Sequence, residues 1–380
     1  MVEAEDNKRA PVAPLRGVKV LELATMITGP LAGMMLGDLG AEVLKIERPN
    51  GGDPFRKYND TLYSPQFASF NRNKTSRVLD LKLEANRATF RDLVADHDVL
   101  IENLRPGNLE SLGLGADALR ALNPRLIHCS ITGFGAVGPY RFRPAYDTVG
   151  QALSGIASLA LDENEPALVG TTISDNVTGM YACYGIMAAL HERHATGRGR
   201  RVEVNMLEAS VAFMPDAFMH YEMFGTVAGP LTRIASSNAY VFKCADAKLV
   251  AIHLSSNEGN WRELVKVLDA PALATDPRFN PRRERIRNYK LLRTELTGLF
   301  ARRPRSEWID LLVEADVPCS PVKTPPEVMD DPQVEALGAF ATMRLATGRD
   351  ARMPRAPVLF DGRRPDAWTP PPAYEDKRGG

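Results

Sequence analysis

Short apolar runs alternate with segments of helical periodicity through the first 130 residues. Residues 18–23 and 41–46 have the pattern of strands, and the segment between them that begins at Gly29-Pro30 and stops at Gly40 has the pattern of a helix. The same reasoning predicts further strands and helices, namely strands at 77–81, 98–102 and 126–131 and helices at 84–95 and 108–121. This alternation predicts an α/β fold with a parallel sheet and right-handed crossovers.

Residues 171–206 combine a loop, a long amphipathic helix that should stop at Gly197, and an alternating strand at 201–205. Asp175 or Asn176 is the expected N-cap of this helix. Asp175 can also be interpreted as a carboxylate nucleophile. A helix N-terminus stabilises negative charge, so we expect this group to be ionised at neutral pH.

The second half of the chain has a different pattern. Residues 207–225 are apolar and helical, and a hairpin is expected from 240–243 and 249–254. Helices should follow, with short strands after them: helices at 257–269, 288–303 and 305–315, and strands at 318–322 and 356–360. We therefore predict a disordered tail at 1–14, a large domain from 15–225 and 331–380, and a small α+β domain at 226–330.

Composition restricts the function classes. The 380 residues are 44% hydrophobic and 25% charged, with 47 acidic and 47 basic residues, so no global field favours nucleic acid or an anionic membrane. The chain has no apolar run of membrane-spanning length and no apolar signal core near its start. The four cysteines are far apart and the histidines form no metal-binding pattern. These features favour a cytoplasmic protein with no metal site.

A glycine motif at Gly133–Gly138 matches GxGxxG, but its context argues against a dinucleotide site. The residues that follow, PYRFRP, do not open a helix cleanly. The turn after the first predicted strand, ATMITGP, has no such motif. A dinucleotide-dependent oxidoreductase is therefore disfavoured, and we interpret the motif as a glycine-rich turn with a structural role.

Polar and basic side chains recur in loops and at strand ends of the predicted sheet: Arg48, Arg72, Lys74, Lys82, Asn103, Arg105, Arg141 and Arg143. Each alone is most often a solvated surface group. Together, at the carboxyl edge of one sheet, they could bind a multiply phosphorylated cofactor.

Eight segments in order resemble the class III CoA-transferases, the family of formyl-CoA transferase, carnitine CoA-transferase and alpha-methylacyl-CoA racemase. They run from about residue 15 to 338 and are LRGVKVLEL, LGDLGAEVLKIERPNGGDPFR, FNRNKTSRVLDLK, DVLIENLRPG, LNPRLIHCSITGFGAVGPY, YDTVGQALSG, SDNVTGMYACYGIMAALHERHATGRGRRVEVNMLEA and VPCSPVKTPPEVMDDPQV.

The resemblance implies an open Rossmann-like domain built from both chain ends, a smaller domain, and an interlocked homodimer. It implies coenzyme A as part of an acyl-CoA donor, a carboxylic acid acceptor, and Asp175 as the catalytic aspartate. The CoA contacts that the resemblance implies are Ile27, Thr28, Arg48, Leu79 to Lys82, Asn103, Leu104, Arg105 and the neighbourhood of Arg143 and Tyr146. Arg72 and Lys74 are added to them from the basic residues at the strand ends. It further implies an aspartyl anhydride and then an aspartyl-CoA thioester as intermediates.

Two departures from family members narrow the expectation. Formyl-CoA transferase has glutamine where this chain has Ile27 and a tetraglycine loop where this chain has GPLTRIASSNAY, so formyl and oxalyl substrates are not expected. The racemase branch has a catalytic histidine at the position of Tyr146, and tyrosine is a poor proton shuttle at neutral pH. This difference favours a transferase over a racemase. The racemase is kept as the main enzymatic alternative, and a non-catalytic CoA-binding homologue is the second alternative.

Overall fold

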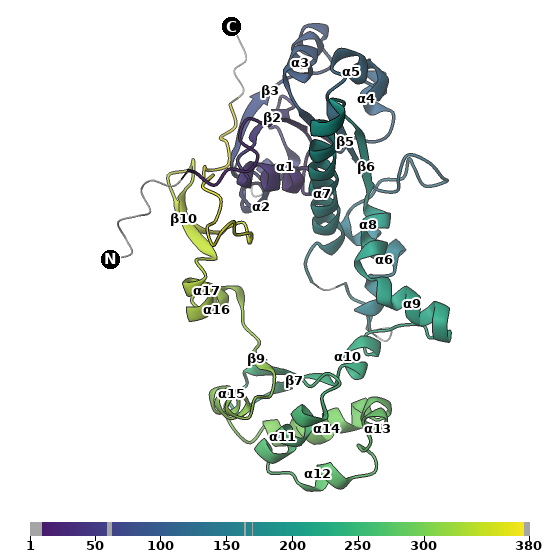
Figure 1. The fold of residues 1–380 in the computed structure, drawn as a ribbon, viewed down its shortest axis with the longest axis vertical. Coiled ribbons are helices and arrows are strands. Elements are labelled where there is room, and N and C mark those ends of the chain that lie inside the picture. The colour runs from purple at the N-terminus through teal and green to yellow at the C-terminus, as the bar shows by residue number, and fades with distance from the viewer. Residues whose placement is uncertain (1–9, 59–62, 163–164, 169, 376–380) are drawn as a thin grey trace. The chain divides into compact units, whose positions relative to one another are not determined.

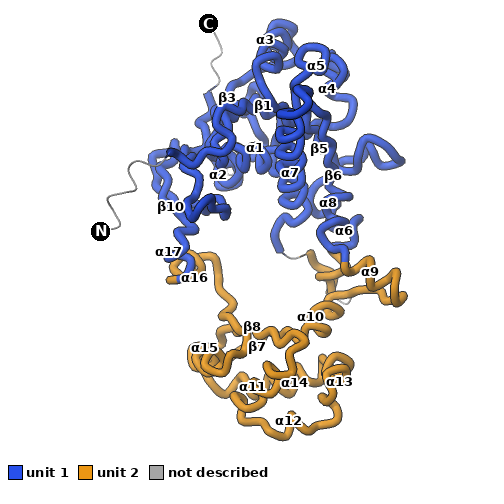
Figure 2. The backbone as a smooth tube through the Cα atoms, viewed as in Figure 1, with its two compact units in different colours: residues 1–156, 170–215, 333–380 blue, residues 157–169, 216–332 orange. Residues whose placement is uncertain are grey.

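The fold is described from a computed structural model, which covers residues 10–58, 63–162, 165–168 and 170–375. The chain divides into two compact units (Figure 2): residues 1–156, 170–215 and 333–380 form the first, and residues 157–169 and 216–332 form the second. The first unit thus contains both ends of the chain. The predicted domain boundaries were 225/226 and 330/331, and residues 157–169 were placed in the large domain.

A six-stranded parallel sheet forms the centre of the first unit (Figure 1). Its strands are β1 (Lys19–Leu23), β2 (Glu42–Glu47), β3 (Lys74–Val78), β4 (Val99–Glu102), β5 (Ile127–Thr132) and β6 (Arg201–Asn205). The order β3-β2-β1-β4-β5-β6 is that of a doubly wound Rossmann-type sheet, in which ligands bind where the order reverses, here between β1 and β4. The predicted α/β class and parallel sheet are confirmed.

Helices cover both faces of this sheet. On one face α1 (Thr28–Asp38) packs against α7 (Ile173–Thr196), above an apolar cluster that includes Val20, Ile101 and Ile131. On the other face α3 (Glu84–Asp96) and α5 (Ala116–Leu122) enclose a second cluster around Phe90 and Leu100. β1, β2 and β4 are buried between these helices on both sides, which explains why most of their side chains are apolar.

Three predicted elements differ from the structure. β3 begins at Lys74, before the predicted 77–81, because its side chains are polar and hide the strand from a hydrophobic pattern. The predicted helix at 108–121 is two helices, α4 (Asn108–Ser111) and α5, because Gly113 has a φ of 70° that ends the first one. The predicted strand at 356–360 forms only an isolated bridge between Phe360 and Arg363.

Shorter elements complete the first unit: the 3-10 helix η2 (Pro54–Lys57), α2 (Pro65–Phe70), α6 (Asp147–Ser154), α8 (Met206–Phe213), α17 (Pro332–Ala336), and the antiparallel hairpin β10 (Phe340–Arg344) and β11 (Asp350–Pro354). The hairpin supplies the strands of the C-terminal region that the sequence pattern missed. None of the described helices is long and apolar enough to cross a membrane.

The C-terminal segment 369–374 lies along the loop after β2. The Tyr63 hydroxyl donates to the Pro371 carbonyl at 2.9 Å, and the Arg56 guanidinium donates to the Pro372 carbonyl at 3.1 Å. The Gly51 amide donates to the Tyr374 hydroxyl at 3.1 Å. Residues separated by more than 300 positions in sequence therefore support one loop. At the other end of the chain, Val12 and Asp366 exchange hydrogen bonds, whereas residues 1–9 of the predicted tail lie outside the described residues.

The second unit is an antiparallel sheet covered by helices. Its strands are β7 (Ala239–Lys243), β8 (Leu249–His253) and β9 (Cys319–Pro321), which confirms the predicted hairpin and the following strand. Its helices are the 3-10 helix η3 (Ala157–Leu159), α9 (Pro215–Phe224), α10 (Thr232–Ser236), α11 (Glu258–Val267), α12 (Ala272–Thr275), α13 (Arg282–Arg287), α14 (Tyr289–Phe300), α15 (Arg305–Glu314) and α16 (Pro325–Met329). Stacked aromatic rings join the sheet to the helices: the ring centroids of Phe242 in β7 and Phe300 in α14 are 4.4 Å apart.

Candidate active site

The loop between β1 and α1 lies where the strand order reverses. Asn103, at the end of β4, fixes this loop through its amide group: its Oδ1 accepts the Thr25 amide at 3.0 Å, and its Nδ2 donates to the Thr25 carbonyl at 2.8 Å and to the Thr28 hydroxyl at 3.1 Å. Asn103, Thr28 and the neighbouring Ile27, predicted separately as contact residues, are therefore brought together.

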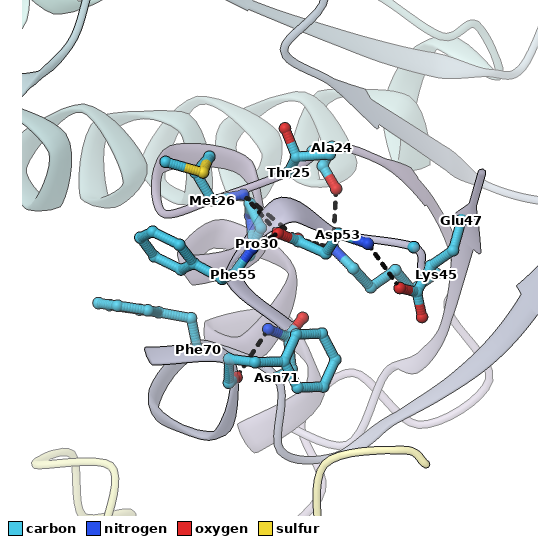
Figure 3. Close-up of polar contacts among 12 residues, drawn as sticks. Ala24, Thr25, Met26, Pro30, Lys45, Glu47, Asp53, Phe55, Phe70 and Asn71 are labelled. Atoms are coloured by element: carbon cyan, nitrogen blue, oxygen red, sulfur yellow. Dashed lines mark hydrogen bonds and ion pairs between the residues drawn. The ribbon is translucent and has the colours of Figure 1, made fainter. Parts of the chain in front are cut away.

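A buried charge cluster supports the same loop from below (Figure 3). The Lys45 ammonium contacts Glu22 at 2.8 Å, Asp53 at 3.0 Å and the Ala24 carbonyl at 2.7 Å, and all three charged side chains are fully buried. Both oxygens of Asp53 accept the Met26 amide at 3.2 Å. Met26 has a φ of 66°, an uncommon value for a residue with a side chain. The Asp53 carboxylate thus holds a strained turn beside Ile27.

Ionisation within this cluster follows from its burial and its pairing. Burial alone lowers the pKa of Lys45, but the carboxylates of Glu22, Asp53 and Glu47 together raise it above its ordinary value. For Lys74, burial dominates over the attraction of Glu22 and lowers the pKa to about 8. Lys45 is therefore the permanent cation of the cluster.

Two predicted contact residues point into the protein. The Lys74 ammonium is buried against Glu22 at 2.8 Å and donates to the Pro30 carbonyl at 2.8 Å. The Arg72 guanidinium forms a two-pronged pair with Asp38, at 2.8 and 2.5 Å. Both side chains are almost fully buried and their charges are already paired. We therefore leave Arg72 and Lys74 out of the cofactor contacts proposed below.

The other predicted contacts follow the carboxyl ends of neighbouring strands. Arg48 follows β2, Leu79 and Lys82 follow β3, and Leu104 and Arg105 follow β4. Because parallel strands end at one edge, these residues share an edge of the sheet. Lys82, Arg105 and the more distant Arg143 and Tyr146 are exposed, Leu79 is buried, and the exposed Arg48 donates from Nε to the Gly52 carbonyl at 2.9 Å.

Asp175 lies in the first turn of α7 but is not its N-cap. The cap position is Thr172, and Asn176 donates from its side chain to the Thr172 carbonyl at 2.5 Å. The predicted cap at Asp175 or Asn176 is therefore wrong, because the observed cap lies three or four residues earlier in the chain. The Asp175 amide donates to Asp147 Oδ1 at 3.1 Å, so a side chain from α6 satisfies this helix start. The Asp175 carboxyl group is left out of capping.

The Asp175 carboxyl group is harder to ionise than the sequence suggested. Burial, and secondarily the negative charge of Asp147, raise the pKa of Asp175 to about 7. The expectation of a fully ionised group at neutral pH is therefore wrong. The helix N-terminus acts in the opposite sense, but it does not offset the loss of water around a half-buried carboxyl group. Near pH 7 this carboxyl group is poised between its two forms.

Asp147 is a site residue that the sequence analysis missed. Its side chain is buried, and Gln151, one turn along α6, donates to its Oδ2 at 2.5 Å. The only sequence signal was its position next to Tyr146, and that neighbour is 65% exposed. The contact with residue 175 depends on the packing of α6 against α7, which no local pattern reveals.

The fold and this site define a class: an α/β enzyme of Rossmann type with a half-buried carboxyl group at a helix start on the ligand-binding edge. Comparison with known proteins gives the family. Residues 15–378 match the family described as CoA-transferase family III, and the chain belongs to that family and is a CoA-transferase.

Similar proteins of known activity cover nearly the whole chain. An acetyl-CoA:oxalate CoA-transferase from Acetobacter aceti is 36% identical over 367 residues, 94% of this chain and 92% of that protein. A succinyl-CoA:glutarate CoA-transferase from Homo sapiens is 32% identical over 372 residues, 95% of this chain and 83% of that protein. A crystal structure of a CAIB/BAIF family protein from Brucella suis has a TM-score of 0.84 at 32% identity, covering 95% of this chain and 96% of its own.

Proposed function

We propose that this enzyme moves CoA from an acyl-CoA donor to a carboxylic acid acceptor, with Asp175 as the covalent nucleophile. The observation that carries the proposal is the placement of a half-buried carboxyl group in the first turn of α7, a helix that packs on α1 and whose Gly179, one turn further on, lies against the Thr28 carbonyl at the start of α1. A carboxylate nucleophile divides one difficult acyl transfer into easier steps. The family membership supplies the reaction class.

The proposed reaction conserves the thioester. A carboxylate oxygen of Asp175 attacks the donor carbonyl, forms a mixed anhydride and releases the CoA thiolate. The thiolate attacks the Asp175 side of the anhydride, which gives an aspartyl-CoA thioester and frees the donor acid. The acceptor carboxylate attacks that thioester and forms a second anhydride, and the thiolate then takes the acceptor acyl group and regenerates the Asp175 carboxylate. No step needs an outside energy source.

The proposed CoA contacts are the predicted set without the two internally paired cations: Ile27, Thr28, Arg48, Leu79, Lys82, Asn103, Leu104, Arg105, Arg143 and Tyr146. All of these except Arg143 and Tyr146 follow closely on the carboxyl ends of strands, and this shared position supports their assignment. Asn103 would act mainly by holding the turn that carries Ile27 and Thr28, since its amide is already used for that turn.

The relatives suggest substrate classes. Their printed activities pair acetyl-CoA or succinyl-CoA with a dicarboxylic acid, so we propose that this enzyme also uses a short acyl-CoA and a dicarboxylic acceptor. The Ile27 side chain, which replaces a polar glutamine of formyl-CoA transferase, favours a less polar acyl group. An acceptor screen that includes oxalate and glutarate will show which dicarboxylic acid this enzyme prefers.

We also propose a homodimer. Large apolar side chains are exposed on two helices of the described chain, with Tyr184 of α7 72% exposed and Phe224 of α9 68% exposed. Side chains of this size are normally buried, and a second copy of the chain would cover them. Light scattering of the purified protein measures the state directly.

Intact-mass spectrometry tests the nucleophile. Incubation with succinyl-CoA alone should add the mass of an aspartyl-CoA thioester at Asp175, and Asp175→Asn should remove both the adduct and the transfer while CoA still binds. Asp117→Asn is the matched control, because Asp117 is an exposed acid in the first turn of α5. Transfer that persists in Asp175→Asn rejects the assignment.

The racemase alternative has a separate test. It requires exchange of the proton next to the thioester carbonyl, and Tyr146 stands where the racemases have a histidine for that exchange. We expect no deuterium in a 2-methylacyl-CoA after incubation in deuterated water without an acceptor acid. Deuterium incorporation that Asp175→Asn abolishes would favour the racemase.

A further inference from the structure

The faces of β5 and β6 that point away from α7 are polar. Cys129 and Ile131 of β5 and Val202 of β6 pack on the α7 side. By strand alternation, His128 and Ser130 of β5 and Arg201 of β6 point to the opposite side. A parallel sheet is normally apolar on both faces. This polar face therefore indicates a site for a polar ligand rather than a helix-packing surface.

A cavity of about 380 Å³ lies over this face. One wall is the segment after β4, with Leu104 and Arg105, and the opposite wall is the loop with Arg141 and Phe142. His128, Ser130, Thr132 and Arg201 form the floor. All of these residues belong to the first compact unit, so the cavity is complete within that unit.

His128 has an unmet need for hydrogen bonds in this cavity. Its side chain is only 8% exposed, and neither ring nitrogen has a hydrogen-bond partner among the described residues. The nearest charged group, Glu102 Oε1, lies 3.6 Å from Nε2, and the other oxygen of Glu102 accepts the Leu104 amide at 2.8 Å. A buried ring nitrogen without a partner destabilises the protein, so a ligand atom that hydrogen-bonds to it here would be stabilising.

The charges around the cavity favour an anion. Three guanidinium groups line it, and of these only Arg201 has a carboxylate partner among the described residues, Glu203 at 3.0 Å. Glu102 and Glu110 also line the cavity and oppose them. Arginine forks match phosphate oxygens in pairs, and Arg201 keeps donors beyond those its partner uses. We propose that this cavity binds a phosphate group, held by Arg141, Arg201 and His128.

This pocket shares Leu104 and Arg105 with the proposed CoA contacts but is separate from the cations at the other end of the sheet. Arg48 and Lys82 follow β2 and β3, whereas the pocket lies over β5 and β6. Strands are about 4.8 Å apart, so β2 and β5, three places apart in the order, are separated by about 14 Å. The phosphate group could come from the nucleotide end of CoA or from a separate phosphorylated molecule. The inference does not depend on the chemistry of Asp175.

Calorimetric titration of the full chain with adenosine 3′,5′-bisphosphate, which has phosphates but no pantetheine arm, tests the pocket. Arg141→Gln and Arg201→Gln should each raise its Kd about tenfold, as expected for a charged hydrogen bond. Arg16→Gln, an exposed arginine before β1, is the matched control and should leave the Kd unchanged. His128→Leu should weaken binding while raising the melting temperature of the ligand-free protein, which a purely structural histidine would not combine.

Competition identifies the source of the phosphate. If CoA supplies it, CoA displaces the bisphosphate and Arg201→Gln weakens CoA more than 3′-dephospho-CoA. If a separate molecule supplies it, the bisphosphate binds to the CoA-saturated enzyme and Arg201→Gln leaves the CoA affinity unchanged. Either result supports the pocket. Absence of saturable binding, or equal binding by Arg201→Gln and Arg16→Gln, overturns the proposal, as does a change of oligomeric state in Arg201→Gln without a change in binding.

Discussion

The Asp147→Asn substitution tests whether the neighbouring charge sets the ionisation of the nucleophile. It removes one negative charge, and the new amide oxygen can still accept the Asp175 amide that Asp147 Oδ1 accepts at 3.1 Å. Gln151 must rotate its amide to remain a partner, a small local change. The fold of the site should therefore persist while its electrostatics change.

The magnitude follows from the causes of the raised pKa. Asp175 has a pKa of about 7 instead of 3.8, and burial is a larger cause than Asp147. Removal of Asp147 should therefore lower the pKa of Asp175 only partly, to about 6. At pH 6 the ionised fraction then rises from about 0.1 to about 0.5, a roughly fivefold gain in kcat, while at pH 8.5 the two enzymes should be about equal.

The assay is kcat against pH from 5.5 to 9, with succinyl-CoA and a dicarboxylic acceptor. Activity should rise with pH through the pKa of Asp175, and the rise should occur at lower pH in Asp147→Asn. Asp117→Asn should follow the wild-type curve. An unshifted rise in Asp147→Asn would show that the charge of Asp147 does not reach the nucleophile, and the electrostatic reasoning would then be refuted.

Three further perturbations have defined outcomes. Asp175→Asn should stabilise the protein at pH 8 by up to about 4 kcal/mol in urea unfolding, because a carboxyl group with a raised folded-state pKa makes stability fall as pH rises from about 4 to 7; the gain should vanish at pH 3, where both states are protonated. Asp53→Ala should lower the free energy of unfolding by about 3–5 kcal/mol, because it removes a buried partner of Lys45. A stability within 1 kcal/mol of wild type would contradict the role given to that pair. Tyr374→Phe should raise KM for acyl-CoA a few-fold with little change in kcat, because it removes the hydroxyl that accepts the Gly51 amide; an unchanged KM would separate this contact from CoA binding.

Most strands of the central sheet could be predicted from the sequence, because buried strands carry mainly apolar side chains and so stand out in the hydrophobic pattern. β1, β2 and β4 are mainly apolar, and Gly197, with a φ of 68°, ends α7 where the glycine rule places it. β3 was misplaced for a physical reason. Its Lys74 side chain is buried against Glu22. From the sequence alone, a lysine is expected on the surface, because its buried partner is not apparent.

The same limit applies to the site. Charge type at strand ends predicted a ligand edge, but it could not separate the exposed Arg48 from Arg72, whose guanidinium group is paired with Asp38 inside the protein. The ionisation of Asp175 was wrong because a helix N-terminus is visible in sequence, whereas desolvation and the contact with Asp147 exist only after α6 packs against α7. Which charged side chains become buried as pairs depends on residues that are distant in sequence, so no local pattern predicts it.

The strap formed by residues 369–374 has a consequence for biosynthesis. The last strand of the central sheet ends at Asn205, but the groups that pair with Arg56 and Tyr63 are about 370 residues from the start of the chain. During translation these groups leave the ribosome well after the strands of the sheet, so the loop that contains Arg48 completes its support only once residues 369–374 have emerged. Nascent or truncated chains that stop before this strap should therefore assemble the sheet yet handle acyl-CoA poorly.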